Sequence, residues 1–316
     1  MGEEKILVAG HLSLDRIKTP DREEDQVPGG AALYTSVAAS VYGGTTGLLT
    51  TCCSDFPKEV LQRIEGLGID VSEVLAVLGR QRRSFMEYSE QFERVTHSHA
   101  RKIWYEKTLE QTPRHLPRKE YTVLVLPPMI PSVQLEYAKW AKKRGMRVCV
   151  DTSEYFAQKD GESLRQVLSW CDVFLPSDVE LDLLWPGCGE STDTLTDRLA
   201  ATSITAAVIK RAEQGADIYD FQSRTAYRIG IRHTLVKDAT GAGDTFNGGF
   251  LSAWCRTGDW KSSGAYGAAL ASLCIESFGF EGVAGRKRSE VEMLAGQIPG
   301  ILRTSFLTGN RNKEKS

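Results

Sequence analysis

The chain carries, at residues 236–250, the stretch VKDATGAGDTFNGGF. Small residues at Gly241, Ala242 and Gly243 let the backbone come close to a ligand, and Asp244 follows at once. The apolar run 246–254 then predicts a buried helix. If this helix opens at Gly243 and Asp244, its first N–H groups lack intrahelical partners and point outward. Together with the positive end of the helix dipole, they would form an anion site.

A carboxylate beside an anion site is typical of phosphoryl transfer. The N–H groups would stabilise the charge that develops on the phosphoryl group, and Asp244 would take a proton from the attacking hydroxyl. The simpler alternative is that Asp244 only caps the helix and that the glycines form a tight turn.

The longer run Asp238-x-Thr-Gly-Ala-Gly-Asp-Thr-Phe-x-Gly-Gly resembles the C-terminal signature of the ribokinase (PfkB-type) carbohydrate kinases. It departs from that signature at Ala239, where the family more often has Thr, Pro or Ser. The resemblance implies ATP-dependent phosphorylation of a hydroxyl, with Asp244 as the base and Gly241–Gly243 as the anion hole. It places Thr240 in cofactor binding. It also makes Asp238 a candidate potassium ligand, with further ligands expected from the loop 277–282.

Composition and charge narrow the class of protein. The chain has 316 residues with 39 basic and 41 acidic side chains, so no global field favours nucleic acid or a membrane surface. We therefore expect no nucleic-acid partner and no membrane partner. The sequence shows no signal-peptide pattern and no apolar run long enough to span a bilayer. Its seven cysteines contain no C-x-x-C pair, which predicts free thiols in the cytoplasm.

Alternating apolar strands and amphipathic helices predict the architecture. Buried strands are expected at 5–10, 44–53, 121–126, 147–151, 172–176 and 206–210. Helices are expected at 29–43, 56–68, 133–144, 164–170 and 265–275. This alternation is typical of a three-layer α/β/α fold with a mostly parallel sheet. We expect one ribokinase-like kinase domain over residues 1–310 and a disordered tail at 308–316.

Two polar segments, at about 12–28 and 82–107, interrupt this alternation. The second is loosely alternating and charged, which predicts an exposed antiparallel sheet with one wet face. The resemblance implies that both segments form a small lid over the sugar, and that a side chain such as Arg83, Glu87 or Arg94 contacts substrate. It also allows a homodimer through the lid. The pair His97 and His99 lacks a Cys or carboxylate at ligand spacing, so we predict no metal site there.

The acceptor site is expected where the first strand ends. Asp15 follows the strand 5–10, and open α/β sheets bind ligands beyond the carboxyl ends of their strands. A carboxylate can accept hydrogen bonds from two adjacent hydroxyls. A solvated loop Asp is the alternative. The resemblance implies that Asp15 contacts the sugar and that the Gly29-Gly30 turn lies against it and hinges the lid.

Tyr34 bears on the identity of the acceptor, which the sequence leaves open. It stands where ribokinase-like members commonly have an Asn that reads the sugar, and this disfavours ribose. Tyr34 would either stack on a substrate ring or lie in the core. The candidates are a hexose, a ribose-like sugar, a nucleoside or a cyclitol. The opening Gly-Gly-Ala-Ala at 29–32 is similar to the inositol-kinase-like branch, which gives a weak preference for inositol.

The magnesium site is expected at Pro176-Ser-Asp-Val-Glu180. The family motif here is Asn-x-x-Glu, in which the Glu organises Mg²⁺ largely through water. Ser177 replaces the Asn, and Glu180 is retained. Because Mg²⁺ keeps much of its water, one carboxylate with ATP oxygens is enough. The alternative is that Glu180 only favours the helix dipole from the first turn.

The ATP phosphates are expected beside the strand 206–210. The segment from Lys210 to Gly215 resembles the family's Val-Lys-x-Gly-x-x-Gly, with Ala212 in place of the first Gly. Lys210 or Arg211 would neutralise nucleotide charge, although a solvated strand-end Lys is the alternative. A catalytically inactive sugar sensor of the same fold also stays open. A dehydrogenase is disfavoured because the first strand lacks Gly-x-Gly-x-x-Gly.

Overall fold

The computed structural model describes residues 4–95, 98–187, 197–199 and 202–303. The predicted tail at 308–316 and His97 lie outside these residues. The main sheet runs in the order β15-β14-β13-β12-β11-β10-β9-β1-β4-β5, and β6 pairs with β4 at one end. The strands are β1 (Ile6–Ala9), β4 (Thr46–Cys53), β5 (Ile69–Asp70), β6 (Val74–Val77), β9 (Val123–Leu126), β10 (Arg147–Val150), β11 (Val173–Phe174), β12 (Ala206–Lys210), β13 (Ala216–Asp220), β14 (Thr225–Ile229) and β15 (Gly300–Arg303).

Parallel pairing extends from β5 through β1 to β12, and the strands from β12 to β15 are antiparallel. Residues of β1 alternate between two hydrophobic cores, with Ile6 and Val8 in one and Leu7 and Ala9 in the other. Strand side chains point alternately to opposite faces, so both faces of this sheet are buried. The predicted mostly parallel sheet is therefore confirmed.

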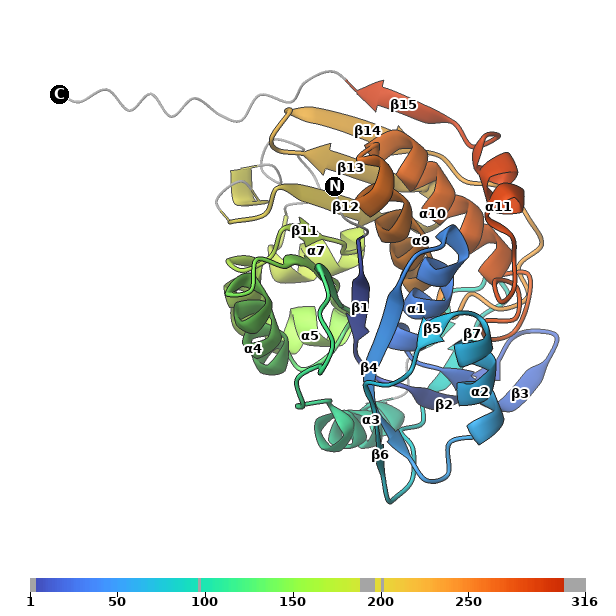
Figure 1. Cartoon of the computed structure of the whole chain (residues 1–316). Coiled ribbons are helices and arrows are strands. Elements are labelled where there is room, and N and C mark those ends of the chain that lie inside the picture. Colours follow the sequence, from blue (N-terminus) through green and yellow to red (C-terminus); the bar gives the residue numbers. More distant parts are fainter. Residues whose placement is uncertain (1–3, 96–97, 188–196, 200–201, 304–316) are drawn as a thin grey trace.

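Helices cover both faces (Figure 1). One layer contains α1 (Ala31–Tyr42), α2 (Lys58–Gly66), α9 (Ala242–Thr257), α10 (Trp260–Cys274) and α11 (Arg288–Ala295). The other contains α4 (Pro131–Lys142), α5 (Glu154–Lys159), α6 (Gly161–Leu168) and α7 (Asp178–Leu184). These layers and the sheet between them form the expected α/β/α sandwich.

Helix α9 lies between α1 and α10, and small residues allow this close packing. A Cβ atom at Gly248 would overlap the carbonyl oxygen of Thr35 in α1. A Cβ atom at Gly249 would overlap the side chain of Leu270 in α10. Gly258 ends α9 with a φ of 67°, and Asp259 caps α10 by accepting from the N–H of Lys261 at 2.9 Å. The N-terminus of α9 is thereby held at a fixed place beside the sheet.

A second sheet has the order β3-β2-β7-β8. Its strands are β2 (Ser13–Lys18), β3 (Glu23–Gly29), β7 (Phe85–Tyr88) and β8 (Arg94–Val95). The smaller sheet is thus confirmed, although β2 pairs with β7 in parallel. The expectation of a sheet throughout 82–107 is wrong, because Ser98–Gln111 forms helix α3. Buried Thr108 and Gln111 fix this helix against the segment before β7, where Gln111 Oε1 accepts from the Arg82 N–H at 2.8 Å.

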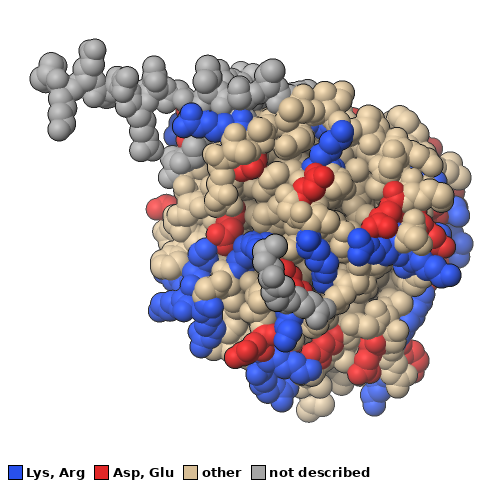
Figure 2. All heavy atoms as spheres, turned by 45° about the horizontal axis from the view of Figure 1, so that its top comes forward, with Lys and Arg blue, Asp and Glu red and all other residues tan. Residues whose placement is uncertain are grey.

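Charged side chains of both signs are interspersed on the face shown in Figure 2, in line with the balanced composition. Among the described helices, none is long and apolar enough to cross a membrane. The cysteines that fall within the described residues are free thiols, and most of them are buried. Burial raises the pKa of Cys149 and Cys171 well above the usual value, so these thiols act as small apolar core residues.

Candidate active site

The predicted anion site is built at the start of α9. Gly241 is the N-cap residue with a left-handed φ of 76°, and Ala242 is the first helical residue. The ring of Tyr34 occupies the space that a side chain at position 241 would need, so Gly is required there. Within the described residues, neither the Gly243 N–H nor the Asp244 N–H donates to a backbone carbonyl of the preceding turn. Both remain available to an anion.

Asp244, the predicted base, is half-buried beside this turn. Its pKa is raised to about 7, first by burial and then by the negative charge of Asp151. The positive charges of Lys210 and Arg82 act in the opposite direction. A carboxyl group with a pKa near neutrality can both hold and release a proton at physiological pH. This is the property that general-base catalysis requires.

Lys210 is the last residue of β12. It forms an ion pair with a carboxylate that follows β10, two strands away in the sheet. Its Nζ lies 3.0 Å from Asp151 Oδ2, and Asn247 Nδ2 donates to the same oxygen at 2.7 Å. Asp151 directly follows β10, and Asn247 belongs to α9. Sequence reasoning assigned no role to these two residues. The position of Asp151 at the end of a buried strand is the signal that could have identified it.

Glu180 completes an acidic group around Lys210. Burial and then the charge of Asp151 raise its pKa to about 8. Its Oε2 accepts from the Ser177 N–H at 2.7 Å, and Ser177 Oγ accepts from the Glu180 N–H at 3.2 Å, as in a capping box. Glu180 therefore also serves the helix end, as the alternative expectation had it.

These carboxylates fit a divalent cation that is held indirectly. Burial raises the pKa values of Asp151, Glu180 and Asp244, and the charge of Asp151 raises those of Glu180 and Asp244 further, whereas Lys210 acts in the opposite direction on all three. In the described residues no group of three His, Cys, Asp or Glu side chains could hold a metal directly. A cation bound by phosphate oxygens and water would suit this arrangement.

A pocket of about 410 Å³ adjoins the anion turn. Of the residues predicted for nucleotide and phosphate binding, Lys210, Gly215, Ala242 and Gly243 line it. Residues of α10 and of the turn that follows it form an apolar part of the pocket wall. The loop 231–236 supplies further lining residues. Two residues of the hairpin between β7 and β8, Gln91 and Phe92, also line it. The smaller sheet thus reaches the same pocket as the predicted phosphate-binding residues.

Two residues predicted for cofactor binding make other contacts. Arg211 forms ion pairs with Asp217 at 2.7 Å and Asp178 at 3.6 Å. Thr240 Oγ1 hydrogen-bonds the Tyr88 hydroxyl at 2.9 Å, which joins the smaller sheet to the anion turn. Neither residue lines the described pocket.

The predicted acceptor residues come together at the base of the smaller sheet. Asp15 is buried, and its Oδ1 accepts from the Ser84 N–H at 3.1 Å. A Cβ atom at Gly29 would overlap the Asp15 carboxylate. Gly30 has a φ of 100°, and a Cβ atom there would overlap the carbonyl oxygen of His11. The Gly-Gly turn therefore lies directly against Asp15 and the end of the first strand.

Two further predicted residues are buried in the frame around the site. Tyr34 is 2% exposed and packs under Gly241, so it is part of the core. Asp238 is fully buried; its Oδ1 accepts from the Thr240 N–H at 2.9 Å and its Oδ2 from the Gly279 N–H at 3.4 Å. The loop 277–282 thus meets Asp238 as expected, and a potassium site there stays a prediction.

The lid residues named from sequence make contacts elsewhere. Arg83 pairs with Asp55 at 3.2 Å, Glu87 pairs with Lys18 at 2.7 Å, and Arg94 is exposed. Arg82, the neighbour of Arg83, is the one whose charge acts on the predicted acceptor carboxylate, Asp15, and on the predicted base, Asp244. Because adjacent residues of an extended segment point to opposite sides, the sequence alone did not distinguish the two arginines.

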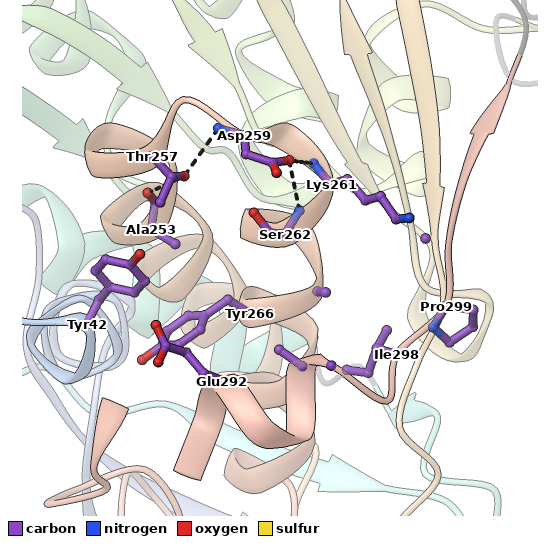
Figure 3. A pocket seen from close by; sticks show the side chains of 14 residues that line it. Tyr42, Ala253, Thr257, Asp259, Lys261, Ser262, Tyr266, Glu292, Ile298 and Pro299 are labelled. Carbon is purple, nitrogen blue, oxygen red and sulfur yellow. Dashed lines mark hydrogen bonds between the residues drawn. The ribbon is translucent and has the colours of Figure 1, made fainter. Parts of the chain in front are cut away.

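A larger pocket of about 790 Å³ lies at the opposite end of α9 (Figure 3). Tyr42, Tyr266 and Glu292 lie near one another on one side of it, and Asp259 and Lys261 come from the start of α10. Its α9 residues, Ala253 and Thr257, belong to the last turns of the helix. It therefore lies roughly 15–20 Å from Asp244, at a helical rise of 1.5 Å per residue.

The fold and the site together define a phosphotransferase. An α/β/α sandwich presents a helix N-terminus with free N–H groups, and a near-neutral carboxylate and a lysine flank it. The chain belongs to the pfkB family of carbohydrate kinases, whose family model it matches over residues 3–282. It is an ATP-dependent kinase of this ribokinase-like family.

Known relatives are similar to the chain over most of its length. A cytidine kinase of Thermococcus kodakarensis is 30% identical over 260 residues, which cover 79% of this chain and 88% of that protein. A nucleoside kinase of Burkholderia thailandensis, solved in complex with ADP-inosine, has a TM-score of 0.75, with 20% identity and coverage of 92% and 95%. A putative ribokinase II of E. coli, solved with ATP and Mg²⁺, has a TM-score of 0.72, with 17% identity and coverage of 93% and 99%. The two solved structures support the fold.

Proposed function

We propose that this kinase transfers a phosphoryl group from MgATP to a ribose hydroxyl of a nucleoside. One observation on the chain carries the choice of acceptor. An aromatic cluster, Trp104, Tyr155 and Phe156, lies next to the acceptor side of the site, and the Arg82 guanidinium is 5.4 Å from the centre of the Trp104 ring. The charge of Arg82 acts on Asp15, so the cluster and the predicted sugar carboxylate are neighbours.

This cluster would suit a nucleobase. Trp104 and Tyr155 are half-buried, with ring centroids 5.5 Å apart, so part of their aromatic surface is exposed. A base attached to a ribose at Asp15 would find rings to stack on, whereas a bare sugar or cyclitol would not need them. The similarity to a cytidine kinase supports the same choice.

The roles of the residues follow from their positions. Asp15 and Gly30 would hold the acceptor hydroxyls, and Asp244 would remove the proton from the attacking one. The free N–H groups of Gly243 and Asp244, presented by the turn at Gly241–Gly243, would stabilise charge on the phosphoryl group, and Lys210 would neutralise the nucleotide phosphates. When bound, Mg²⁺ would supply further charge neutralisation on the ATP oxygens, with Glu180 placed to bind its water.

A cyclitol such as inositol is the second candidate acceptor. The Gly-Gly-Ala-Ala opening at 29–32 and the Tyr at position 34 favour it. The packing of Tyr34 beneath Gly241 weakens this argument, because the residue that marks the departure from ribokinase-like members is part of the core. An inactive sugar sensor is disfavoured by the raised pKa of Asp244, since a residual carboxylate would not need such an environment.

The test is ADP release with MgATP over cytidine, uridine, adenosine, inosine, ribose, fructose and myo-inositol, with Asp244→Asn in parallel. Turnover on a nucleoside at the lowest KM, lost in the variant, would support the proposal. Preferential turnover of myo-inositol would replace it with the cyclitol candidate. ATP binding without turnover on any acceptor would favour the sensor.

Two finer properties belong to the same proposal. We also infer that Asp238 and carbonyl oxygens of the loop 277–282 bind K⁺, which predicts higher turnover in KCl than in tetramethylammonium chloride. The smaller sheet offers an exposed face for a second copy of the chain. Sedimentation equilibrium would show whether a dimer forms, and charge substitution on β8 would show whether this sheet is the contact.

A further inference from the structure

Arg82 is a buried cation at the base of the smaller sheet. It is 6% exposed, and its carbonyl oxygen accepts from the Leu14 N–H at 2.9 Å, next to Asp15 in β2. Two residues later, the Ser84 N–H donates to the Asp15 carboxylate. The backbone around Arg82 is therefore fixed against the strand that carries the acceptor carboxylate.

The guanidinium is held by neutral groups. Its Nη1 donates to Thr108 Oγ1 at 3.2 Å, and its central carbon lies over the ring of Trp104, 5.4 Å from the ring centre. Within the part of the chain that the structure describes, Arg82 forms no ion pair within 4.0 Å, and its buried Nε has no hydrogen-bond partner. A buried guanidinium normally has a carboxylate or another oxygen-rich partner, because desolvation of an unpaired charge is costly. An external partner would therefore account for this arrangement.

The surrounding charges indicate where that partner lies. Burial lowers the pKa of Arg82 to about 10, and the negative charges of Asp15 and then Asp244 oppose this shift. Arg82 thus lies within electrostatic reach of both the predicted acceptor carboxylate and the predicted base. The position between these carboxylates is where the acceptor hydroxyl becomes a phosphate ester.

We propose that Arg82 is a catalytic residue that binds the phosphoryl group as it reaches the acceptor, with the free Nε–H as a donor. The inference rests on the proposed kinase mechanism, but it holds for any acceptor held by Asp15. Arg82 would act from the acceptor side, opposite the α9 N-terminus and Lys210 on the nucleotide side. Negative charge moving from ATP to the product would then meet a cation at both ends of its path.

A second effect follows from the same position. Asp244 is faced by Asp151 at the end of β10, by Lys210 at the end of β12 and by Arg82 before β7. Loss of the Arg82 charge would raise the pKa of Asp244, because one of its two stabilising cations would be absent. The acidic limb of the pH profile would therefore move to higher pH.

The test compares Arg82→Gln, Arg82→Lys and a matched control, Arg144→Gln. Arg144 also faces a tryptophan, with its guanidinium 4.7 Å from the centre of the Trp140 ring, but it is exposed at the end of α4. Removal of one transition-state donor typically costs 10²–10³-fold in kcat. We expect about this loss in Arg82→Gln and an acidic limb moved up by on the order of one pH unit. Arg82→Lys should return the acidic limb of the pH profile to its wild-type position, because the positive charge is kept. It should restore only part of kcat, because an ammonium lacks the fixed guanidinium geometry.

A binding experiment makes the inference independent of the acceptor. ADP with Mg²⁺ and aluminium fluoride mimics the phosphoryl group in transfer, and calorimetry measures its affinity without turnover. We expect Arg82→Gln to weaken this complex at least tenfold while ADP alone binds within about threefold of wild type. The role would be overturned if Arg82→Gln bound both ligands as tightly as wild type does. It would also be overturned if kcat fell while the acidic limb of the pH profile stayed in place. Wild-type inactivity on every nucleoside would overturn the proposed acceptor instead.

Discussion

Replacement of Asp244 by Asn should make the enzyme slower and more stable at once. The carboxylate is half-buried, near Asp151, and its pKa is raised from 3.8 to about 7. Above pH 7 the folded protein must hold it ionised, whereas the unfolded chain ionises it near pH 4 without cost. Asn keeps the shape and removes the charge. The proposed base would therefore be maintained at the expense of folding stability.

The size of the effect follows from proton linkage. A raised carboxyl pKa stabilises the folded state below the unfolded pKa, and this stabilisation is lost as pH rises through the folded pKa. A shift of roughly three units corresponds to at most about 4 kcal/mol, at about 1.4 kcal/mol per unit. Because the carboxylate is partly exposed to solvent, screening reduces this figure to roughly 1–3 kcal/mol at pH 8. The gain from Asn at pH 5 should be roughly one third of that at pH 8.

Urea unfolding of wild type and Asp244→Asn at pH 5 and pH 8 measures this difference, and steady-state kinetics measures turnover. We expect kcat to fall about 10²–10⁴-fold while ATP affinity is retained, as for the loss of a general base. Asp197→Asn removes a carboxylate at an exposed position and serves as the control for a general charge effect.

Any of three results would refute the reasoning. If Asp244→Asn were less stable than wild type at pH 8, the carboxylate would be a structural helix cap, as the simpler sequence interpretation has it. If ATP binding were lost together with turnover, Asp244 would be part of the nucleotide site. An equal gain in stability at both pH values would show that ionisation is not its cause.

Three other substitutions test the frame of the site, and a fourth, in α2, serves as a control. Lys210→Met should raise the KM for ATP about tenfold or more, because the nucleotide phosphates lose a cation, and kinetics at fixed acceptor would check it. Tyr88→Phe removes the hydrogen bond to Thr240, a net loss of about 1 kcal/mol, so kcat/KM for the acceptor should fall roughly fivefold while the melting temperature changes little. Gly30→Ala should destabilise the fold by more than about 2 kcal/mol, through backbone strain and overlap with a carbonyl oxygen. Gly66 lies in α2 with open space around it, so Gly66→Ala should raise the free energy of unfolding by about 0.5–1 kcal/mol in the same urea titration.

Much of this protein is determined by local sequence. Short apolar runs that end in polar residues predict buried parallel strands, and the structure has a strand in each predicted range of the main sheet. The Gly-Ala-Gly segment at 241–243 predicts a helix N-terminus with free N–H groups, and a side chain at position 241 would overlap the ring of Tyr34. Such features depend on backbone sterics and hydrophobic periodicity, which act within a few residues.

Tertiary structure decided the features that depend on distant partners. Helix α3 replaced an expected sheet because its polar face binds the segment before β7. Arg82 rather than Arg83 is buried beside the strand that carries Asp15, because strand pairing, not local sequence, sets which side chain points inward. The same holds for the near-neutral pKa of Asp244, which is raised first by burial and then by Asp151 at the end of another strand, and which Lys210 opposes. Electrostatic coupling acts through space, so a sequence can supply each charge without showing which charges become neighbours.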